Sequence, residues 1–300
     1  MSGSIVILDG SMGQELETAG APFRRPEWSA LALMEGPDHV RRAHDAYVAA
    51  GAEILTTNAY ALVPYHIGEA RFAADAARLA ALAGRLAREA ADAAGEGRVR
   101  VAGCLPPLFG SYRPDLFDPA RAPELLAVLI GAQAPYVDLW LAETMGSIAE
   151  VEAVRTALKD DGRPLWLAFT LKDDHPDLAD PRLRSHETVD DAVRAAVRLG
   201  AGAVLFNCSQ PEVMGAAVSL ACQTLRDLGG DLPVGVYANA YVPMTDDTES
   251  NTDTAILRPE LDPPAYLDFA RGWVRRGATI IGGCCGIGPE HVAALRRAFG

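Results

Sequence analysis

Three cysteines of the chain stand in a pattern typical of a metal site. Cys284 and Cys285 are adjacent within the glycine-rich run 282–286, and Cys208 lies far upstream. Consecutive residues of a strand point to opposite faces, so both neighbouring thiols can reach one ion only where the backbone turns sharply, as glycines permit. Three thiolates around zinc leave one tetrahedral position open, as in catalytic zinc sites. Zinc lowers the pKa of a thiol that enters this position, and the thiolate is the nucleophile of sulfur alkylation.

The cysteines also have other interpretations. Five cysteines are an odd number in a chain of 300 residues, which favours reduced thiols in a reducing compartment over a disulfide framework. A disulfide between Cys284 and Cys285 would be strained and would need an oxidant. Cys222 lies in an apolar helical run and is expected to be a small buried residue, and Cys104 is not expected to be a ligand. The six histidines show no metal-binding spacing.

Charge and hydropathy exclude two classes of partner. The chain has 40 acidic and 27 basic residues, and its formal net charge of -13 opposes binding to phosphate backbones and anionic lipid surfaces. Apolar residues make up 49% of the chain, yet nowhere do about 18 of them run together. The segment Met1 to Leu8 carries no basic region of the kind that begins a secretory signal. We therefore expect a cytoplasmic globular protein without nucleic-acid or membrane partners, and the sequence indicates no oligomeric state.

The chain alternates between short β-rich runs and longer runs of Ala, Leu and Arg at helical spacing. Strands are predicted at Ile5 to Leu8, Glu53 to Thr56, Val99 to Ala102, Val137 to Leu141, Leu165 to Phe169, Ala203 to Phe206, Val234 to Tyr237 and Thr279 to Ile281. Helices are predicted at Pro37 to Ala50, Glu69 to Ala94, Pro123 to Ala132, Ile148 to Leu158, Thr188 to Leu199, Pro211 to Leu228, Pro264 to Arg276 and Pro289 to Phe299.

The joints between helices and strands favour a barrel. Gly51, Gly200 and Gly277 each follow a helical run and precede a strand, where a left-handed C-cap is needed. Eight strand-helix units with right-handed crossovers most simply form a closed parallel (β/α)8 barrel with the helices outside. A doubly wound open sheet is the alternative. A barrel of this length is routinely one domain, so residues 1–300 are expected to form a single one.

Barrel enzymes carry their chemistry at the C-terminal ends of the strands, and here those ends are rich in reactive side chains. The residues after the predicted strands are Asp9-Gly10-Ser11, Thr57-Asn58-Ala59-Tyr60, Gly103-Cys104, Glu143-Thr144, Asn207-Cys208, Asn239 and Gly282 to Gly286. All of them are expected to converge on one rim. The connections Leu171 to Glu187 and Ala240 to Pro263 are unusually long, and each is expected to be either a solvated surface loop or a lid over the barrel mouth.

Together these motifs resemble the homocysteine S-methyltransferase family. The resemblance spans nearly the whole chain and rests mainly on Gly282-Gly283-Cys284-Cys285-Gly286, Phe206-Asn207-Cys208, Leu8 to Gly13 and Thr56 to Tyr60. Gly110-Ser111-Tyr112 and Ala142-Glu143-Thr144 also fall in family order. The resemblance implies a (β/α)8 barrel with Zn²⁺ on Cys208, Cys284 and Cys285, homocysteine as methyl acceptor and methionine as product.

The resemblance also implies roles for residues around the metal. Asp9 and Glu143 would meet the amino group of homocysteine, while Thr57 and the backbone near Gly10 would help to seat the amino acid. Two carboxylates facing one ammonium group is physically reasonable, because the cation keeps both ionised. Asn58 belongs to the same predicted substrate site.

Simpler roles remain open for several of these residues. Asp9 could cap the turn that follows it, and Glu143 could cap the helix that begins near Met145. The ring of Tyr60 could face a donor cation or pack in the core. Asn239 could occupy the open zinc position when no thiol is bound, or support the cysteines from behind.

The sequence departs from the family pattern in two places. The segment Tyr237 to Tyr241 lacks a proline before Asn239 and a glycine two residues after it, and Cys104 to Pro107 replaces a small-residue and Gly-Pro pattern. Both segments lie where the methyl donor is expected. Family members use S-methylmethionine or S-adenosylmethionine, betaine, or methylfolate through a cobalamin module. Because one barrel accounts for all 300 residues, a sulfonium donor is predicted, with betaine second.

The leading prediction is thus a zinc-dependent S-methyltransferase that joins a small-molecule thiol to a small-molecule methyl donor. Within this prediction the thiol could be one other than homocysteine. A protein of another class would carry the same cysteines: a non-catalytic zinc- or thiol-binding barrel, or a partner subunit of a corrinoid methyl-transfer system.

Overall fold

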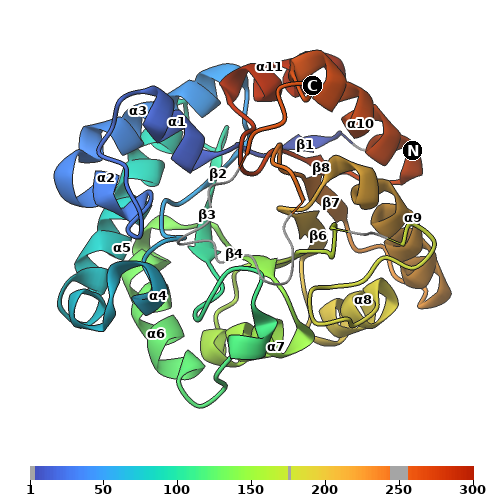
Figure 1. Ribbon diagram of the computed structural model, residues 1–300, viewed down its shortest axis with the longest axis horizontal. Coiled ribbons are helices and arrows are strands. Elements are labelled where there is room, and N and C mark those ends of the chain that lie inside the picture. Colours follow the sequence, from blue (N-terminus) through green and yellow to red (C-terminus); the bar gives the residue numbers. More distant parts are fainter. Residues whose placement is uncertain (1–3, 175–176, 244–255) are drawn as a thin grey trace.

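The computed structural model describes residues 4–174, 177–243 and 256–300, which form a ring of parallel strands inside a ring of helices (Figure 1). The strands are β1 (Val6–Ile7), β2 (Ile54–Thr56), β3 (Arg100–Leu105), β4 (Leu139–Met145), β5 (Leu165–Phe169), β6 (Ala203–Asn207), β7 (Val234–Tyr237) and β8 (Ile280–Ile281). They pair in the order β1-β8-β7-β6-β5-β4-β3-β2. A parallel bridge between Leu8 and Ile54 joins β1 to β2. The structure therefore confirms the (β/α)8 barrel, and the open-sheet alternative is wrong.

The helices of the outer ring largely match the predicted ones. They are α3 (Pro37–Ala50), α5 (Glu69–Ala93), α6 (Ala122–Gln133), α7 (Ile148–Leu158), α8 (Val189–Arg198), α9 (Pro211–Asp227), α10 (Pro263–Arg276) and α11 (Pro289–Phe299). The predicted glycines follow three of them with left-handed backbones, at φ of 99° for Gly51, 67° for Gly200 and 116° for Gly277. Capping boxes begin α7, with Ser147 and Glu150, and α8, with Thr188 and Asp191.

Five short helical segments were not predicted. They are α1 (Met12–Thr18), α2 (Ala30–Glu35), α4 (Pro64–Ile67) and the 3-10 helices η1 (Pro114–Leu116) and η2 (Ala134–Tyr136). Each spans two turns or fewer, which is too short for a 3.6-residue period to become visible in the sequence. All except η2 lie in connections that leave the C-terminal ends of β1, β2 and β3, so they build the wall of the barrel mouth.

Three strands continue further than their predicted ends, β3 to Leu105, β4 to Met145 and β6 to Asn207. Cys104 pairs with Leu141 across β3 and β4, and Met145 pairs with Phe169 across β4 and β5 after a shift of register. Gly103, Cys104, Glu143, Thr144 and Asn207 therefore lie inside strands rather than after them, which corrects the prediction. The polar Glu143 interrupts the apolar run from which the strand was predicted, although every residue of β4 is buried.

The barrel interior is filled with side chains, so a site can form only at one end of it. Alternate residues of each strand face the two sides: in β6, Ala203 and Leu205 belong to the interior cluster, whereas Val204 and Phe206 pack under the helices. The inner cluster consists of Leu8, Ile54, Ala102, Leu139, Leu141, Trp166, Ala168, Ala203, Leu205, Tyr237 and Ile280. The C-terminal strand ends lie above this plug.

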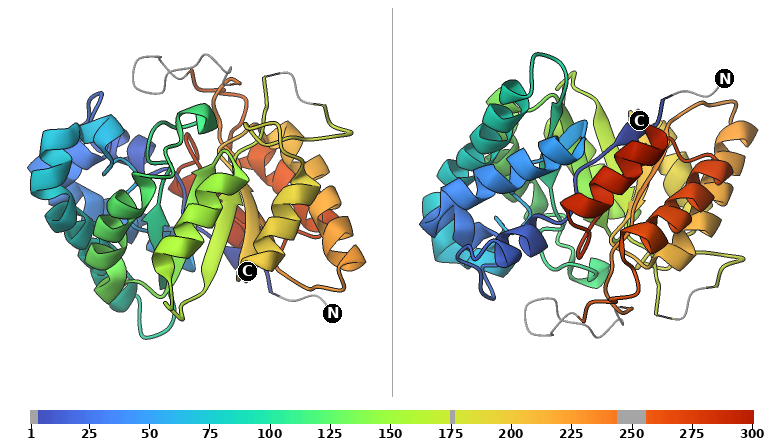
Figure 2. Two further views of the ribbon diagram at one scale, coloured as in Figure 1. Left: turned by 90° about the horizontal axis from the view of Figure 1, so that it is seen from below. Right: turned by 90° about the horizontal axis from the view of Figure 1, so that it is seen from above.

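The two long connections leave at the same end of the barrel (Figure 2). Within the first, Leu171 and Leu183 form an antiparallel bridge, and within the second Tyr241 bridges Leu257. Residues 175–176 and 244–255 of these connections lie outside the described residues. Among the residues that are described, no helix combines the length and apolar character needed to cross a membrane.

Candidate active site

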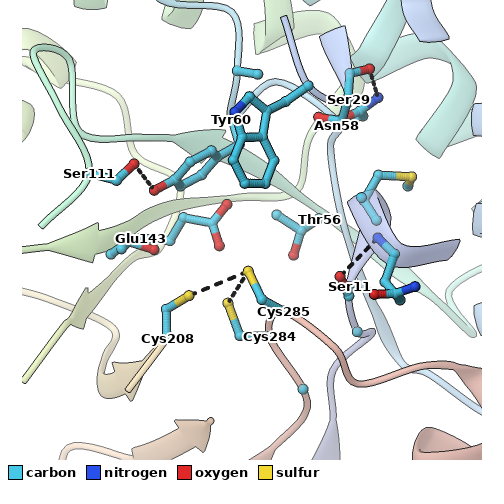
Figure 3. Close-up of a pocket in the computed structure, with 18 of the residues that line it drawn as sticks. Ser11, Ser29, Thr56, Asn58, Tyr60, Ser111, Glu143, Cys208, Cys284 and Cys285 are labelled. Carbon is cyan, nitrogen blue, oxygen red and sulfur yellow. Dashed lines mark hydrogen bonds between the residues drawn. The ribbon is translucent and has the colours of Figure 1, made fainter. Parts of the chain in front are cut away.

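The sulfur atoms of the three predicted cysteines meet at the C-terminal end of the barrel (Figure 3). Sγ of Cys208 lies 3.6 Å from that of Cys285, which lies 4.0 Å from that of Cys284, and all three are within 4.8 Å of one another. A disulfide would need about 2.05 Å. Four ligands at about 2.3 Å around tetrahedral zinc place sulfurs about 3.8 Å apart. The three free thiols are therefore spaced as ligands of one metal ion.

The turn that carries Cys284 and Cys285 depends on its glycines, as the sequence predicted. The Cys284 amide donates to the carbonyl of Ala238 at 2.9 Å, and the Ile287 amide donates back to the Cys284 carbonyl at 3.0 Å. A Cβ on Gly283 would lie 2.1 Å from Cγ2 of Ile287, far inside van der Waals contact. Gly286 has a φ of 81°. This tight turn lets both neighbouring thiols face Cys208.

Cys208 is held in a left-handed conformation, with a φ of 50°. Such a backbone costs of order 1–3 kcal/mol and persists only where its surroundings impose it. The Asn207 side chain accepts from the Thr144 amide and donates to the Thr144 hydroxyl, both at 2.9 Å. The Leu171 amide donates to the Ser209 hydroxyl at 2.8 Å. Both neighbours of Cys208 are thus anchored to β4 and to the end of β5, which fixes the direction of its thiol.

The charges of the three sulfurs depend on one another. Hydrogen bonds from Cys284, Cys285 and Tyr112 hold the pKa of the Cys208 thiol well below its ordinary value. Hydrogen bonding to Cys208, together with its negative charge, raises the pKa of both Cys284 and Cys285 well above theirs. Only a bound cation allows all three thiolates to exist together, so the donor set fits a metal ion. Elsewhere in the described residues no group of Cys, His, Asp and Glu has metal-ligand spacing.

A cavity of about 730 Å³ opens beside the three sulfurs. Its lining includes nearly every predicted site residue, namely Asp9, Gly10, Thr57, Asn58, Tyr60, Glu143, Cys208, Cys284 and Cys285. In the view of Figure 3, Glu143 and Thr56 lie between the cysteines and Tyr60. The predicted convergence on one rim is therefore borne out for these residues, and Asn239 does not line the cavity.

Asp9 and Glu143 form a buried acidic pair. Asp9 accepts hydrogen bonds from the amide of Thr56 at 2.7 Å and from its hydroxyl at 3.2 Å. Glu143 accepts one from the Cys104 thiol at 2.9 Å and one from the Tyr237 hydroxyl at 3.5 Å. Burial raises the pKa of Asp9 to about 8, with a contribution from the charge of Glu143, and burial raises the pKa of Glu143 to about 7. A cation placed at this pair would restore both charges.

Neither carboxylate is a helix cap, so those alternative roles are wrong. The Ser11 hydroxyl accepts from the Gln14 amide at 3.2 Å and caps α1, while Ser147 caps α7. Both carboxylates instead accept hydrogen bonds from residues of other strands. A purely structural role would leave two buried carboxyl groups without a charged partner. Buried charges are normally paired.

The three predicted residues after β2 shape the wall of the cavity. The Thr57 hydroxyl accepts from the Cys104 amide at 2.9 Å and donates to Gln133 at 2.5 Å. Asn58 donates to the Ser29 carbonyl at 3.1 Å. The Tyr60 hydroxyl bonds that of Ser111 at 2.7 Å, and its ring packs against the core while lining the cavity. Both alternatives for the Tyr60 ring are therefore compatible with its position.

Asn239 is fully buried, and its backbone amide donates to the carbonyl of Ser209, the residue after Cys208, at 3.1 Å. Its Oδ1 accepts from the Tyr241 amide at 3.3 Å and from Gln210 at 3.4 Å, and its Nδ2 has no partner among the described residues. These contacts fit a supporting position more closely than a ligand position. Its two expected roles stay predictions.

Sequence reasoning missed four residues that act at the site. Thr56 bonds Asp9, Tyr237 bonds Glu143, and the Tyr112 hydroxyl lies 3.0 Å from Sγ of Cys208. Trp28 lines the cavity from the segment before α2. Tyr112 belongs to the motif Gly110-Ser111-Tyr112, but nothing in the order of residues shows that it reaches Cys208, 96 positions away.

Comparison with known proteins agrees with this geometry. The sequence profile of a family described as homocysteine S-methyltransferase matches residues 6–299. The chain belongs to the homocysteine S-methyltransferase family. It is an S-methyltransferase that acts on small molecules, as its sequence had indicated.

Individual relatives support the assignment over the full length of the chain. The homocysteine S-methyltransferase of Escherichia coli (strain K12) is 31% identical, covering 97% of this chain and 94% of that protein. Homocysteine S-methyltransferase YbgG of Bacillus subtilis (strain 168) is 27% identical, with 97% and 93% covered. The crystal structure of the homocysteine methyltransferase MmuM from Escherichia coli in its metallated form matches with a TM-score of 0.77 and 26% identity, covering 99% and 97%. The family's members include a metallated form, and this chain has a cysteine cluster that could hold a metal.

Proposed function

We propose that this family member transfers a methyl group from a sulfonium donor, S-methylmethionine or S-adenosylmethionine, to homocysteine, giving methionine. We further propose that Cys208, Cys284 and Cys285 hold Zn²⁺. The observation that carries the proposal is the tetrahedral spacing of three sulfurs in a cavity that also contains the buried pair Asp9 and Glu143. Soft thiolate donors favour zinc over hard cations such as Mg²⁺ and Ca²⁺.

The three cysteines would hold the metal ion, which would supply Lewis-acid chemistry: the pKa of a bound substrate thiol would be lowered, so that a thiolate is available near neutral pH. The thiolate sulfur forms a bond to the donor methyl carbon while the bond from that carbon to the sulfonium sulfur breaks. The electron pair of the broken bond stays with the donor sulfur, which leaves as a neutral thioether. No general acid is needed for this departure, because the leaving group is neutral.

The protein residues supply orientation. Asp9 and Glu143 hold the ammonium group of homocysteine, while Gly10, Thr57 and Asn58 form the wall against which the amino acid lies. A side chain at position 10 would meet the Ile287 carbonyl at 2.3 Å, so glycine is required for the close packing of this wall. Fixing the acceptor at both its amino group and its sulfur reduces the entropy lost on reaching the transition state. Tyr60 and Trp28 place aromatic surface on the cavity, which suits a sulfonium cation.

A matrix of thiols against methyl donors, with zinc-loaded protein and no other protein present, tests this function. Homocysteine, cysteine and a homocysteine analogue without the amino group would be combined with S-methylmethionine, S-adenosylmethionine and betaine, and products identified by mass spectrometry. We expect methionine from homocysteine with a sulfonium donor. Methionine formed with betaine but with neither sulfonium would show that betaine is the donor. Methylation of a different thiol would change the acceptor. Turnover only after addition of a corrinoid protein would make the chain a partner subunit of a corrinoid methyl-transfer system.

The cytoplasmic location and the single domain spanning residues 1–300 stay predictions from the sequence. We expect the chain to be active when it is expressed alone in the reducing cytoplasm of a host cell. We also expect its cysteines to be recovered as free thiols.

A further inference from the structure

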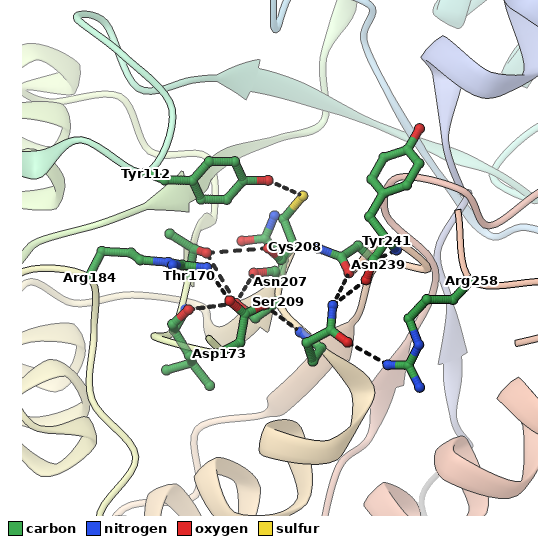
Figure 4. Close-up of polar contacts among 12 residues, drawn as sticks. Tyr112, Thr170, Asp173, Arg184, Asn207, Cys208, Ser209, Asn239, Tyr241 and Arg258 are labelled. Carbon is green, nitrogen blue, oxygen red and sulfur yellow. Dashed lines mark hydrogen bonds and ion pairs between the residues drawn. The ribbon is translucent and has the colours of Figure 1, made fainter. Parts of the chain in front are cut away.

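Tyr112 makes a direct contact with one ligand sulfur. It lies between β3 and η1 with a φ of 65°, and its hydroxyl oxygen is 3.0 Å from Sγ of Cys208 (Figure 4). A cysteine that ligates a metal is a thiolate, which has no proton to give. In the metal-bound protein the hydroxyl must therefore be the donor of this hydrogen bond.

The Arg184 member of a buried ion pair packs over the ring of Tyr112. The Arg184 guanidinium carbon lies 5.1 Å from the ring centroid, and Nη2 of Arg184 lies 2.6 Å from Oδ1 of Asp173. The side chains of Arg184 and Asp173 are 1% and 0% exposed. The second oxygen of Asp173 accepts from the Gln210 amide at 2.9 Å, at the start of α9. This pair is thus fixed at both of its carboxylate oxygens.

The arrangement has an electrostatic consequence for the sulfur. A cation over an aromatic face is attracted by the electrons of the ring and draws them toward itself. A phenol with less electron density is a stronger hydrogen-bond donor. The chain of contacts from Asp173 through Arg184 and Tyr112 therefore ends in a strengthened hydrogen bond to Cys208.

We propose that Tyr112 is a positioning residue, fixed by Arg184 and Asp173, which orients the sulfur of Cys208 and withdraws negative charge from it. The inference rests on the proposed metal site. Less charge on the ligand sulfur leaves the metal centre more acidic toward the incoming thiol. Removing a group that hydrogen-bonds a metal ligand lowers metal affinity or activity by about 10- to 100-fold. The effect of this contact can therefore be measured.

The same contacts assign a task to the first long connection. Asp173 and Arg184 both belong to the segment Leu171 to Glu187, and Tyr112 belongs to the connection after β3. The described part of this segment is therefore not only solvated surface, since its buried ion pair contacts Tyr112, which bonds Cys208 just after β6. This role differs from the two expected from the sequence, a solvated surface loop and a lid over the barrel mouth.

The test uses cobalt(II) in place of zinc, because the sulfur-to-cobalt charge-transfer band reports the electron density of the ligand sulfurs. A hydrogen bond stabilises the sulfur lone pair, so its removal in Tyr112→Phe should move the band to longer wavelength. Arg184→Lys keeps a positive charge beside Asp173 but loses the flat guanidinium, and a smaller shift in the same direction is expected. The matched control is Tyr237→Phe, which removes a hydroxyl that bonds Glu143 instead of a sulfur, and its band should coincide with that of the wild type.

Methyl transfer by zinc-loaded Tyr112→Phe is expected to fall about tenfold. A shifted band with unchanged thermal unfolding, or loss of cobalt binding in Tyr112→Phe alone, supports the inference. An unshifted band in fully loaded Tyr112→Phe overturns it, whatever the activity. The spectra require no substrate, so failure of the proposed methyl transfer is distinguished from failure of this inference. A wild-type protein without the charge-transfer band would overturn the metal centre and this inference with it.

Discussion

Asp9 and Glu143 are both buried beside the cavity, and burial raises the pKa of their carboxyl groups to about 8 and about 7. Near neutral pH the pair by itself therefore carries less than its full negative charge. An ammonium group bound between the two carboxylates restores both charges and removes the cost of burying them. A site built in this way rejects an analogue without the amino group, because the buried polar groups are then left unpaired. We therefore expect selectivity for an amino-acid thiol to depend on these two residues.

The first prediction concerns Glu143→Gln. The change keeps the shape of the side chain and removes its charge, so binding of the ammonium group weakens by about 1.5–3 kcal/mol. We expect kcat/KM for homocysteine to fall about 10- to 100-fold, mostly through KM. The control substrate is the thiol without an amino group, whose low kcat/KM should not fall further. Equal losses for both thiols would show that Glu143 does not bind the amino group.

The second prediction concerns the ligands themselves. Cys284→Ala removes one of three sulfurs, so bound zinc, measured by elemental analysis, should fall to a trace, and methyl transfer should fall below detection. Cys222→Ala is the matched control, because this cysteine is half-buried on α9 and does not line the cavity. It should retain both zinc and turnover. Full turnover by metal-free Cys284→Ala protein would disprove the proposed role of the cluster.

At the scale of an element, the turn between β8 and α11 shows how local backbone geometry creates the site. Its amides and carbonyls bond the ends of neighbouring strands, through Gly283 to Asp9 at 3.0 Å and Cys284 to Ala238 at 2.9 Å. Those bonds bring the backbone so close to Ile287 that no side chain fits at position 283. The position of the two thiols and the requirement for glycine at position 283 therefore both follow from this close packing.

The third prediction follows from this close contact. Gly283→Ala places a methyl group 2.1 Å from Cγ2 of Ile287, so the turn must move. We expect the free energy of unfolding to fall by about 1–3 kcal/mol, with weaker zinc binding, in chemical denaturation and chelator competition.

Gly131→Ala is the control for this turn. Gly131 lies on exposed α6 surface with nothing within 4 Å of the added Cβ. An alanine in a helix interior should stabilise the protein by about 0.5–1 kcal/mol and leave zinc binding as it is. Comparable loss of zinc by both variants would contradict the proposed role of the turn.

At the scale of the whole molecule, the barrel gathers residues from distant parts of the chain and excludes water beneath them. Cys208 follows β6, Cys284 and Cys285 lie in the turn after β8, and the hydrogen bond to the Cys208 sulfur comes from the connection after β3. Asp9 follows β1, and Glu143 lies within β4. The outer helices bury even a polar group, since His44 on α3 is fully buried and its two ring nitrogens have no partner among the described residues. Such a group makes the stability of the barrel depend on pH.

The fourth prediction is acid destabilisation through His44. Burial, with a contribution from the positive charge of Arg41, lowers the pKa of His44 from 6.5 to about 3. The unfolded chain therefore binds a proton below pH 6.5 that the folded protein does not, and stability is lost as pH falls toward 3. At pH 5 the loss from this residue is about 2 kcal/mol.

Urea denaturation at pH 7 and pH 5 measures this effect. His44→Leu removes the titrating group at similar volume, so the difference between the two pH values should be about 2 kcal/mol smaller than in the wild type. An identical difference in both proteins would show that His44 is protonated in the folded state. Other titrating groups contribute equally to both proteins and cancel in the comparison.

Much of the architecture could be predicted because it depends on local chemistry. The strands β5 and β7 and the helices α3, α7 and α11 begin and end at the predicted residues, since apolar period and capping signals are properties of neighbouring residues. The three cysteines could be identified because glycines beside two adjacent thiols have few other uses. Short helices escaped prediction because they are stabilised by packing and not by their own period.

The amino-acid sequence by itself thus determined the barrel, the cysteine cluster and the class of reaction. Tertiary structure alone decided that Glu143 lies within β4, that Ser11 and Ser147 take the capping roles, and that Tyr112 reaches Cys208. These facts depend on strand register and on the stacking of separate connections over the barrel mouth. Contacts between residues 96 positions apart arise only when the ring of strands closes, so no local pattern carries them.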